Sequence, residues 1–146
     1  MKPYTENRKA RHDYETIETF EGGLSLTGAE AKSIREGGAK LLGAFLRVQK
    51  GELWLIGGHI SPYSKQGKRE GIDPDRNRKV LVHRRELHRL AEKTQQKGLT
   101  LVPFSFYPSA RRIKVAFGLC RGRKDYDKKE KLKERDLTRQ IRRGDE

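Results

Sequence analysis

The strongest constraint on the fold is that large apolar residues occupy every second position between Arg111 and Cys120. The apolar positions of this alternation are Ile113, Val115, Phe117 and Leu119. A period of two is that of a β-strand with one buried face. The outer face is then expected to carry Arg112, Lys114 and Cys120. A second apolar run, Leu99 to Tyr107, precedes it, and residues 108–110 supply a turn, so the sequence predicts two paired strands.

A looser alternation runs from Tyr14 to Leu26 and predicts a further strand. The glycine pair 22–23 interrupts it, which indicates a bulge or a sharp bend. Thr27 and Glu30 then have the spacing of a capping box, so we expect a helix from about residue 28 to residue 36.

Two strand-like runs, Ala44 to Gln49 and Glu52 to Ile60, flank the dipeptide 50–51, whose glycine favours a tight hairpin turn. Residues 61–79 are polar and rich in Gly, Pro, Lys and Arg. A stretch of this length is unusual as a simple connection, so it is either a functional loop or disordered. Val80 to Val82 restarts a strand.

One amphipathic helix is predicted after that strand. Its apolar stripe has the spacing i, i+3, i+4, i+7 and consists of Leu87, Leu90, Ala91 and Thr94. Gly98 is placed to end this helix.

The order of these elements predicts a mainly β (α+β) chain. The fold expected is a small OB-like antiparallel Greek-key barrel with two to three appended helices and a basic C-terminal tail, because closure removes exposed strand edges. A two-layer α+β sandwich is the alternative. Residues 1–120 would form the barrel domain, and residues 121–146 the tail.

Charge indicates the class of partner. The chain has 34 Lys and Arg against 20 Asp and Glu, a formal net charge of +14, which attracts polyanions such as nucleic acids. Its single cysteine excludes an intramolecular disulfide, and no apolar run is long enough for a membrane span. The four histidines lack metal-ligand spacing, so no metal or cofactor is expected. These features favour a cytoplasmic protein without a membrane partner.

The tail has little to bury. Residues 121–146 contain eleven Lys or Arg and seven Asp or Glu, and its appreciably apolar side chains are Tyr126, Leu132, Leu137 and Ile141. Acid-to-base pairs such as Asp125 with Lys129 stand at the i, i+4 spacing that supports a helix, although only weakly. We therefore expect a tail that is disordered when free and helical on a polyanionic partner. A merely solvated terminus is the alternative.

Two kinds of chemistry are compatible with these residues. Basic clusters lie near tyrosines, a mixture that suits phosphate contacts and base stacking in RNA. A basic ribonuclease that uses His12 and Asp13 as acid and base is an alternative, as is a structural ribosomal protein. The sequence contains no helix-turn-helix, zinc-finger or zipper pattern for reading DNA.

Five segments in order resemble the SsrA-binding protein (SmpB) family: "NRKARHDY", "FEGGLSLTGAEAKSIREG", "RNRKVLVHRREL", "GLTLVP" and "GLCRGRKDYDKK". The resemblance implies an RNA-binding protein that is not an enzyme. Such a protein binds the tRNA-like domain of transfer-messenger RNA (tmRNA) and delivers it to stalled ribosomes for trans-translation, with one protein monomer per RNA. The chain departs from the usual family residues at Ala31, Cys120, Arg123 and Lys129.

The resemblance also implies which residues contact RNA. On the barrel these are the matching positions Asn7, Glu21 and Leu81, with the basic neighbours Arg8, Lys9, Arg11, Arg78 and Lys79. In the tail, which would enter the empty mRNA channel of the small subunit and meet ribosomal RNA, they are Arg121, Arg123, Lys124, Tyr126, Asp127, Lys128 and Lys129. Tyr126 and Asp127 would lie at the decoding centre, where a planar ring can stack on a base.

Overall fold

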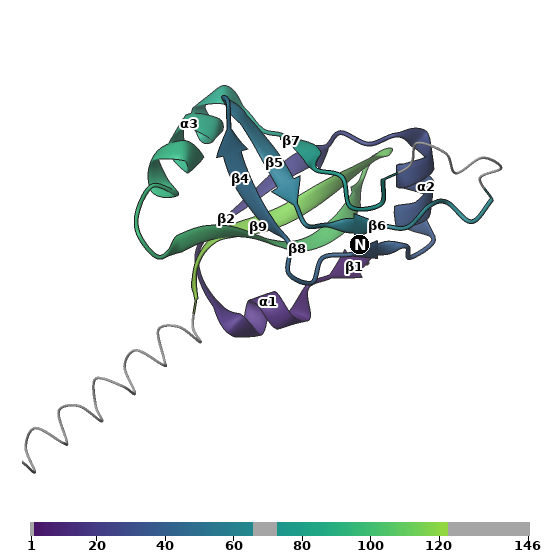
Figure 1. Ribbon diagram of the computed structural model, residues 1–146, viewed down its shortest axis with the longest axis horizontal. Coiled ribbons are helices and arrows are strands. Elements are labelled where there is room, and N and C mark those ends of the chain that lie inside the picture. The colour runs from purple at the N-terminus through teal and green to yellow at the C-terminus, as the bar shows by residue number, and fades with distance from the viewer. Residues whose placement is uncertain (1, 66–72, 123–146) are drawn as a thin grey trace, which may run out of the picture.

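Long alternating strands dominate the computed structural model, which describes residues 2–65 and 73–122 (Figure 1). The strands are β1 (Thr5–Glu6), β2 (Tyr14–Leu24), β3 (Ala39–Lys40), β4 (Phe45–Gln49), β5 (Glu52–Ile56), β6 (His59–Ile60), β7 (Arg78–Leu81), β8 (Leu99–Ser109) and β9 (Arg112–Gly122). The helices are α1 (Arg8–Asp13), α2 (Gly28–Arg35) and α3 (Arg84–Lys93). The last strand therefore runs two residues past the predicted domain boundary at residue 120.

The main sheet closes on itself. Its seven strands follow the order β1-β8-β4-β5-β7-β2-β9, and β9 also pairs with β8. The strands of this sheet other than β1 thus form a six-stranded antiparallel ring, one strand more than the five of a typical OB-fold, while β3 and β6 pair in a separate two-stranded sheet. β2 lies between β7 and β9, which are distant in sequence, as in a Greek key. The predicted mainly β barrel is confirmed, and the two-layer sandwich is not observed.

The barrel interior contains the predicted apolar face of β9. Ile113, Val115, Phe117 and Leu119 are at most 4% exposed. Phe20 of β2 stacks on Phe117 with ring centroids 5.5 Å apart. Cys120 lies on the other face of β9, as predicted, but it is fully buried there.

Cys120 belongs to a second, smaller cluster outside the barrel. Its buried members are Ala10, Val102, Phe104 and Cys120. Ala10 comes from α1, a helix that the sequence analysis did not predict, and α1 packs on β8. α1 therefore covers part of the outer barrel surface. As a result, the outer face of β9 is buried near its C-terminal end, at Cys120. Burial raises the pKa of the Cys120 thiol.

Two local predictions need correction. The irregularity in β2 is not at the glycine pair but between Thr16 and Glu18, where the pairing with β9 shifts register. Gly22 instead permits close packing, since an added Cβ would lie 2.6 Å from Cγ1 of Val80. α3 ends at Lys93, well before Gly98, because Thr94 caps it and residues 95–98 turn into β8.

The turns and the remaining helix fit their sequences well. Lys50 and Gly51 have φ values of 51° and 74°, as the tight β4–β5 hairpin requires. The β8–β9 turn is at Ala110 and Arg111, later than predicted, with φ 54° at Ala110. α2 begins with the predicted capping box of Thr27 and Glu30.

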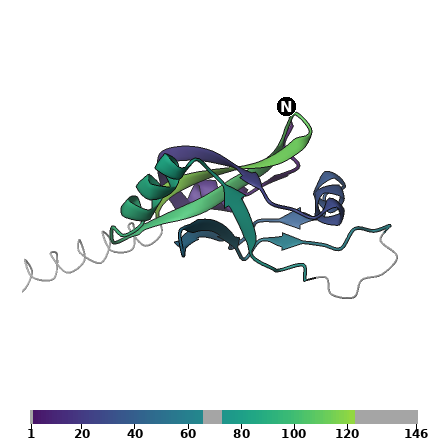
Figure 2. The ribbon, with the colours of Figure 1, turned by 90° about the horizontal axis from the view of Figure 1, so that it is seen from above.

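The helices occupy different sides of the barrel. α2 and α3 lie at opposite ends, and α1 lies below the long β8–β9 hairpin in the first view (Figure 1 and Figure 2). None of the helices in the described ranges is long and apolar enough to cross a membrane.

Candidate nucleic-acid interface

The N-terminal basic cluster is held on α1 by Asn7. The Asn7 Oδ1 accepts a hydrogen bond from the Ala10 backbone N–H at 3.3 Å, which caps the helix. Its Nδ2 donates to the carbonyl oxygens of Leu41 (3.2 Å) and Pro103 (3.0 Å). Asn7 is only 5% exposed, so its side chain faces inward instead of forming part of an RNA-binding surface. It positions the exposed basic residues of α1, which are Arg8, Lys9 and Arg11.

Arg11 and Glu21 are brought to one groove. The Arg11 guanidinium lies 5.5 Å from the centre of the Phe104 ring, a cation–π contact. Arg11, Glu21 and Tyr107 line a groove of about 730 Å³ along the outer barrel surface. Arg8 lies 3.5 Å from the Glu6 carboxylate and does not line this groove.

Glu21 is an oriented, charged carboxylate. The Tyr107 hydroxyl donates a hydrogen bond to Glu21 Oε2, and Lys114 Nζ lies 3.7 Å from Oε1. The Tyr107 hydrogen bond, followed by the charge of Lys114, lowers the pKa of Glu21. Burial, together with the Glu21 carboxylate, raises the pKa of Tyr107 to about 12. At neutral pH Glu21 is therefore an acceptor for ligand N–H groups, and Tyr107 stays a donor.

A second groove, of about 710 Å³, begins at Glu21 and extends to Leu81. Leu81 is half exposed although it is a large apolar residue, and it pairs with Gly23 across β7 and β2. The cationic side chains that line this groove are Arg35, Arg111, Arg112 and Lys114. An exposed apolar side chain among cations suits contact with a sugar or base between phosphates.

Lys79 and Arg78 are neighbours in β7 with opposite surroundings. Lys79 is surface-exposed and lies 3.3 Å from Glu52. Arg78 is only 1% exposed, and its guanidinium donates to Glu30 Oε2 through Nε (2.9 Å) and to the Gly58 carbonyl through Nη1 (2.7 Å). The structure therefore separates Arg78 from the surface on which sequence reasoning had placed it.

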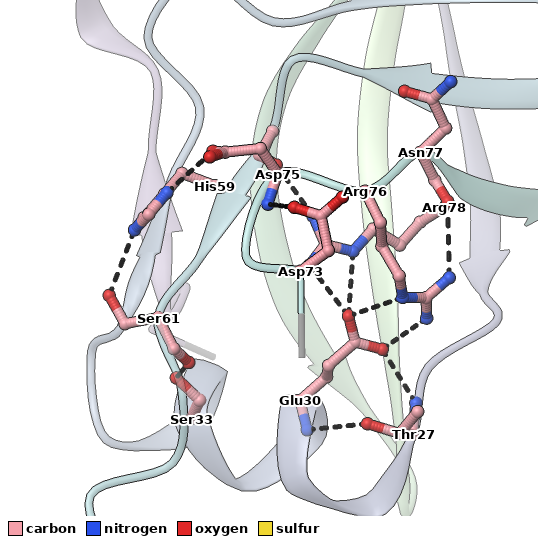
Figure 3. A network of polar contacts seen from close by, with 11 residues as sticks. Thr27, Glu30, Ser33, His59, Ser61, Asp73, Asp75, Arg76, Asn77 and Arg78 are labelled. Atoms are coloured by element: carbon pink, nitrogen blue, oxygen red, sulfur yellow. Dashed lines mark hydrogen bonds and ion pairs between the residues drawn. The ribbon is translucent and has the colours of Figure 1, made fainter. Parts of the chain in front are cut away.

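The Glu30 carboxylate is the centre of a buried polar network that sequence reasoning missed (Figure 3). Besides Arg78, it accepts hydrogen bonds from Arg76 and from the Thr27 backbone N–H. Burial alone would raise the pKa of Glu30, but the hydrogen bonds from Arg76, Thr27 and Arg78 lower it to about 2. The sequence feature that could have indicated this network is the i, i+2 spacing of Arg76 and Arg78, which puts both side chains on one side of an extended chain.

His59 is held between two side chains in the same region (Figure 3). Its Nδ1 lies 2.8 Å from Asp75 Oδ1, and its Nε2 lies 3.3 Å from the Ser61 hydroxyl. The order Ser–His–Asp is that of a hydrolase triad, but triad aspartates are buried and the Asp75 side chain is 70% exposed. We interpret these contacts as structural, because they link β6 to the segment that leads to β7.

The His12–Asp13 pair that motivated the ribonuclease alternative lies at the C-terminal end of α1. His12 Nδ1 is 3.2 Å from Asp13 Oδ1, and the His12 side chain is 86% exposed. Both residues belong to the last turn of α1, a helix that the sequence analysis did not predict. Within residues 2–65 and 73–122, no cluster of three or more His, Cys, Asp or Glu is arranged to hold a metal ion.

Most of the predicted tail contacts lie outside the described residues: Arg123, Lys124, Tyr126, Asp127, Lys128 and Lys129. Arg121 lies within β9, where it is exposed and pairs with Glu15 of β2 and Leu99 of β8. The last described residue of β9, Gly122, pairs with Tyr14 of β2. Residues 66–72 of the predicted functional loop are also outside the described ranges.

Comparison with known proteins gives one consistent result. The family model described as SmpB protein matches residues 4–145. An SsrA-binding protein of Coprothermobacter proteolyticus is 46% identical over 98% of this chain and 96% of its own length. One of Carboxydothermus hydrogenoformans is 49% identical over 96% and 93%. A chain in a solved structure described as "tmRNA-SmpB: a journey to the center of the bacterial ribosome" is 50% identical, with a TM-score of 0.68 over 81% of this chain and 82% of that chain.

Proposed function

The chain belongs to the SmpB family, the SsrA-binding proteins, and from this premise we propose that its barrel binds the tRNA-like domain of tmRNA and delivers it to stalled ribosomes for trans-translation. In this role the protein is a carrier of RNA and not an enzyme, and one monomer serves one RNA. Because its partners are tmRNA and the ribosome, it acts in the cytoplasm.

The observation that carries this proposal is the position of Glu21 between two grooves. One groove contains Arg11, and the other contains Leu81 and Lys114. Cations on both sides neutralise phosphates, which supplies affinity without sequence readout. The Glu21 carboxylate, oriented by Tyr107, accepts hydrogen bonds from base amino groups and supplies recognition.

The burial of two predicted contact residues changes their proposed roles. Asn7 supports the interface by holding α1, and Arg78 supports it by fixing β7 against α2. Direct contacts are assigned to the surface residues Arg8, Lys9, Arg11, Glu21, Lys79 and Leu81.

The proposed role of the tail rests on the family resemblance. Residues 121–146 would enter the empty mRNA channel of the stalled small subunit, where the basic side chains meet ribosomal RNA. Tyr126 and Asp127 would lie at the decoding centre. The composition of the tail supports this role, since a chain with few apolar residues gains order mainly by neutralising charge on a partner.

A single charge reversal tests the barrel interface. Glu21→Lys adds positive charge, so simple attraction to RNA predicts tighter binding, whereas loss of an oriented acceptor predicts weaker binding. We expect the affinity for the tRNA-like domain to fall about tenfold or more, measured by equilibrium binding at two salt concentrations.

Glu15→Lys is the matched control, because Glu15 is an exposed acid on the same strand and lines neither groove. It should leave the affinity unchanged or raise it slightly. Equal or tighter binding by Glu21→Lys would contradict the assigned interface.

A further inference from the structure

A small pocket lies beside the start of α2, apart from the two grooves at Glu21. Its volume is about 220 Å³, and its walls come from the N-terminal turn of α2, the residues after β6 and the residues that lead into β7. The side chains that matter here are Ser61, Tyr63, Asp73, Arg76 and Arg78. Figure 3 shows Asp73, Arg76 and Arg78 near Glu30, whereas Ser61 lies beside Ser33 and His59.

The pocket wall contains a buried donor that is ion-paired but makes no well-aligned hydrogen bond. Arg78 Nη2 lies 2.8 Å from Glu30 Oε2, yet it makes no hydrogen bond of acceptable geometry among the described residues. The Arg78 Nε already donates to that same oxygen at 2.9 Å. A buried N–H group without an acceptor is costly, so an acceptor atom from a ligand would be stabilised here.

The same wall offers a spare acceptor. Asp73 Oδ1 accepts a hydrogen bond from the Asp75 backbone N–H at 2.9 Å. An ionised carboxylate has about four acceptor positions, and this bond uses one of them. Asp73 is exposed, so a ligand can reach the remainder.

The charge of the pocket argues against phosphate. Arg76 and Arg78 supply two positive charges, and Glu30 and Asp73 supply two negative charges. A phosphate site needs an excess of donors and positive charge, which this wall lacks. The balance suits a neutral group that has both N–H donors and carbonyl acceptors.

Tyr63 adds a flat apolar surface to the wall. Lys32 Nζ lies 5.6 Å from the centre of the Tyr63 ring and does not line the pocket. Lys32 therefore supports the ring from outside the pocket, and the ring contributes its own surface to the interior. Tyrosine rings stack on unpaired bases of RNA.

From these features we propose that the pocket binds one unpaired guanine of the RNA. Guanine presents adjacent N–H donors to a carboxylate, here Asp73, and a carbonyl oxygen to a guanidinium, here Arg78. Tyr63 stacks on the base. The inference rests on the proposed function, since it takes the RNA to be the tRNA-like domain of tmRNA. It adds to the interface a base-specific site that is separate from the two grooves at Glu21.

Chemical probing of the RNA in complex with the full-length protein tests this site. A reagent that attacks N1 and N2 of unpaired guanine should find one guanine protected by the wild-type protein. Asp73→Asn should abolish that protection and weaken binding about tenfold, because the amide places a donor against the base. Tyr63→Leu should weaken binding about tenfold or more, whereas Tyr63→Phe should retain both stacking and protection.

Asp75→Asn is the matched control, since Asp75 contacts His59 and does not line the pocket. It should leave the protection intact. The proposal is overturned if wild-type protein binds the RNA without protecting a guanine, if Asp73→Asn protects it equally, or if the protected base is not guanine. A wild-type protein that fails to bind the RNA at all would instead overturn the proposed function.

Discussion

Glu30 joins three parts of the molecule through one carboxylate. It caps α2 through Thr27 and holds Arg76 and Arg78, which precede and begin β7. Its side chain is 11% exposed and that of Arg78 is 1% exposed, so this ion pair is shielded from solvent and screened little by salt, whereas Arg76 is partly exposed. Loss of the carboxylate would leave Arg78 buried without a counter-charge, which is the costly way to break such a pair.

Glu30→Gln should lower the free energy of unfolding by about 3 kcal/mol at pH 7, measured by urea denaturation. The folded-state pKa of Glu30, about 2, lies below the ordinary glutamate value of 4.5. The contribution is therefore complete above pH 4.5 and is lost as the pH falls towards 2. The stability difference between wild type and Glu30→Gln should shrink between pH 5 and pH 2.

Glu52→Gln provides the comparison. Glu52 pairs with Lys79 on the surface, where such pairs contribute less than about 1 kcal/mol. The buried pair is not the source of the stability if the loss of unfolding free energy in Glu30→Gln does not change with pH. The same conclusion follows if that loss is no larger than the loss in Glu52→Gln.

At the scale of elements, α1 depends on a clamp from one side chain. The helix has six residues, too few to be stable alone, and Ala10 is its one buried side chain. Asn7 links the helix to two carbonyl groups by hydrogen bonds. One belongs to Leu41, which precedes β4, and the other to Pro103, which lies within β8. The basic surface of α1 therefore exists only when the barrel has formed.

Asn7→Ala should lower the free energy of unfolding by roughly 2 kcal/mol, through loss of a helix cap and of two donors to buried carbonyl groups. It should also weaken RNA binding, because the basic side chains of α1 are no longer held. Asn7→Ser separates the two causes, since serine caps helices well but cannot reach both carbonyl groups.

If the clamp matters more than the cap, serine and alanine should be equally destabilising in urea denaturation. Variants within about 0.5 kcal/mol of wild type would contradict a structural role for Asn7.

At the scale of the whole molecule, the barrel and the segment after it have separate proposed tasks. β9 pairs with β2 as far as Gly122, opposite Tyr14, so a truncation there leaves every barrel strand intact. Among the described residues, neither Arg121 nor Gly122 lines the two grooves at Glu21.

A chain that stops after Gly122 should bind the tRNA-like domain with an affinity within about threefold of wild type, apart from the general loss of basic charge. It should fail to support tagging on stalled ribosomes in a reconstituted translation assay. The charge loss is controlled by comparing the two chains at high salt. Normal tagging by the truncated chain, or loss of RNA binding at high salt, would contradict the division of tasks.

Local patterns accounted for much of the fold. The alternation in β9, the Lys50–Gly51 turn and the Thr27–Glu30 capping box are each set by interactions between near neighbours, so they could be read directly. The end of α3 was misplaced because a cap at Thr94 outweighed the later glycine. α1 was missed because a short polar helix has almost no apolar periodicity.

Only part of the candidate site could be predicted from the sequence. Family motifs identified Glu21 and Leu81, which do line one groove, but could not show that Asn7 and Arg78 face inward. Whether a polar residue on a strand lies inside or outside depends on what packs over it, and that information comes from residues far away in the sequence.

The sequence by itself determined the long strands, the Lys50–Gly51 turn, the positive charge and the family. Only the tertiary structure decided that β8 and β9 close the barrel, that Cys120 is buried beneath α1, and that Glu30 meets two arginines almost fifty residues away. Periodicity and capping act over a few residues, whereas closure, burial and long-range ion pairs depend on which distant surfaces meet when the chain folds.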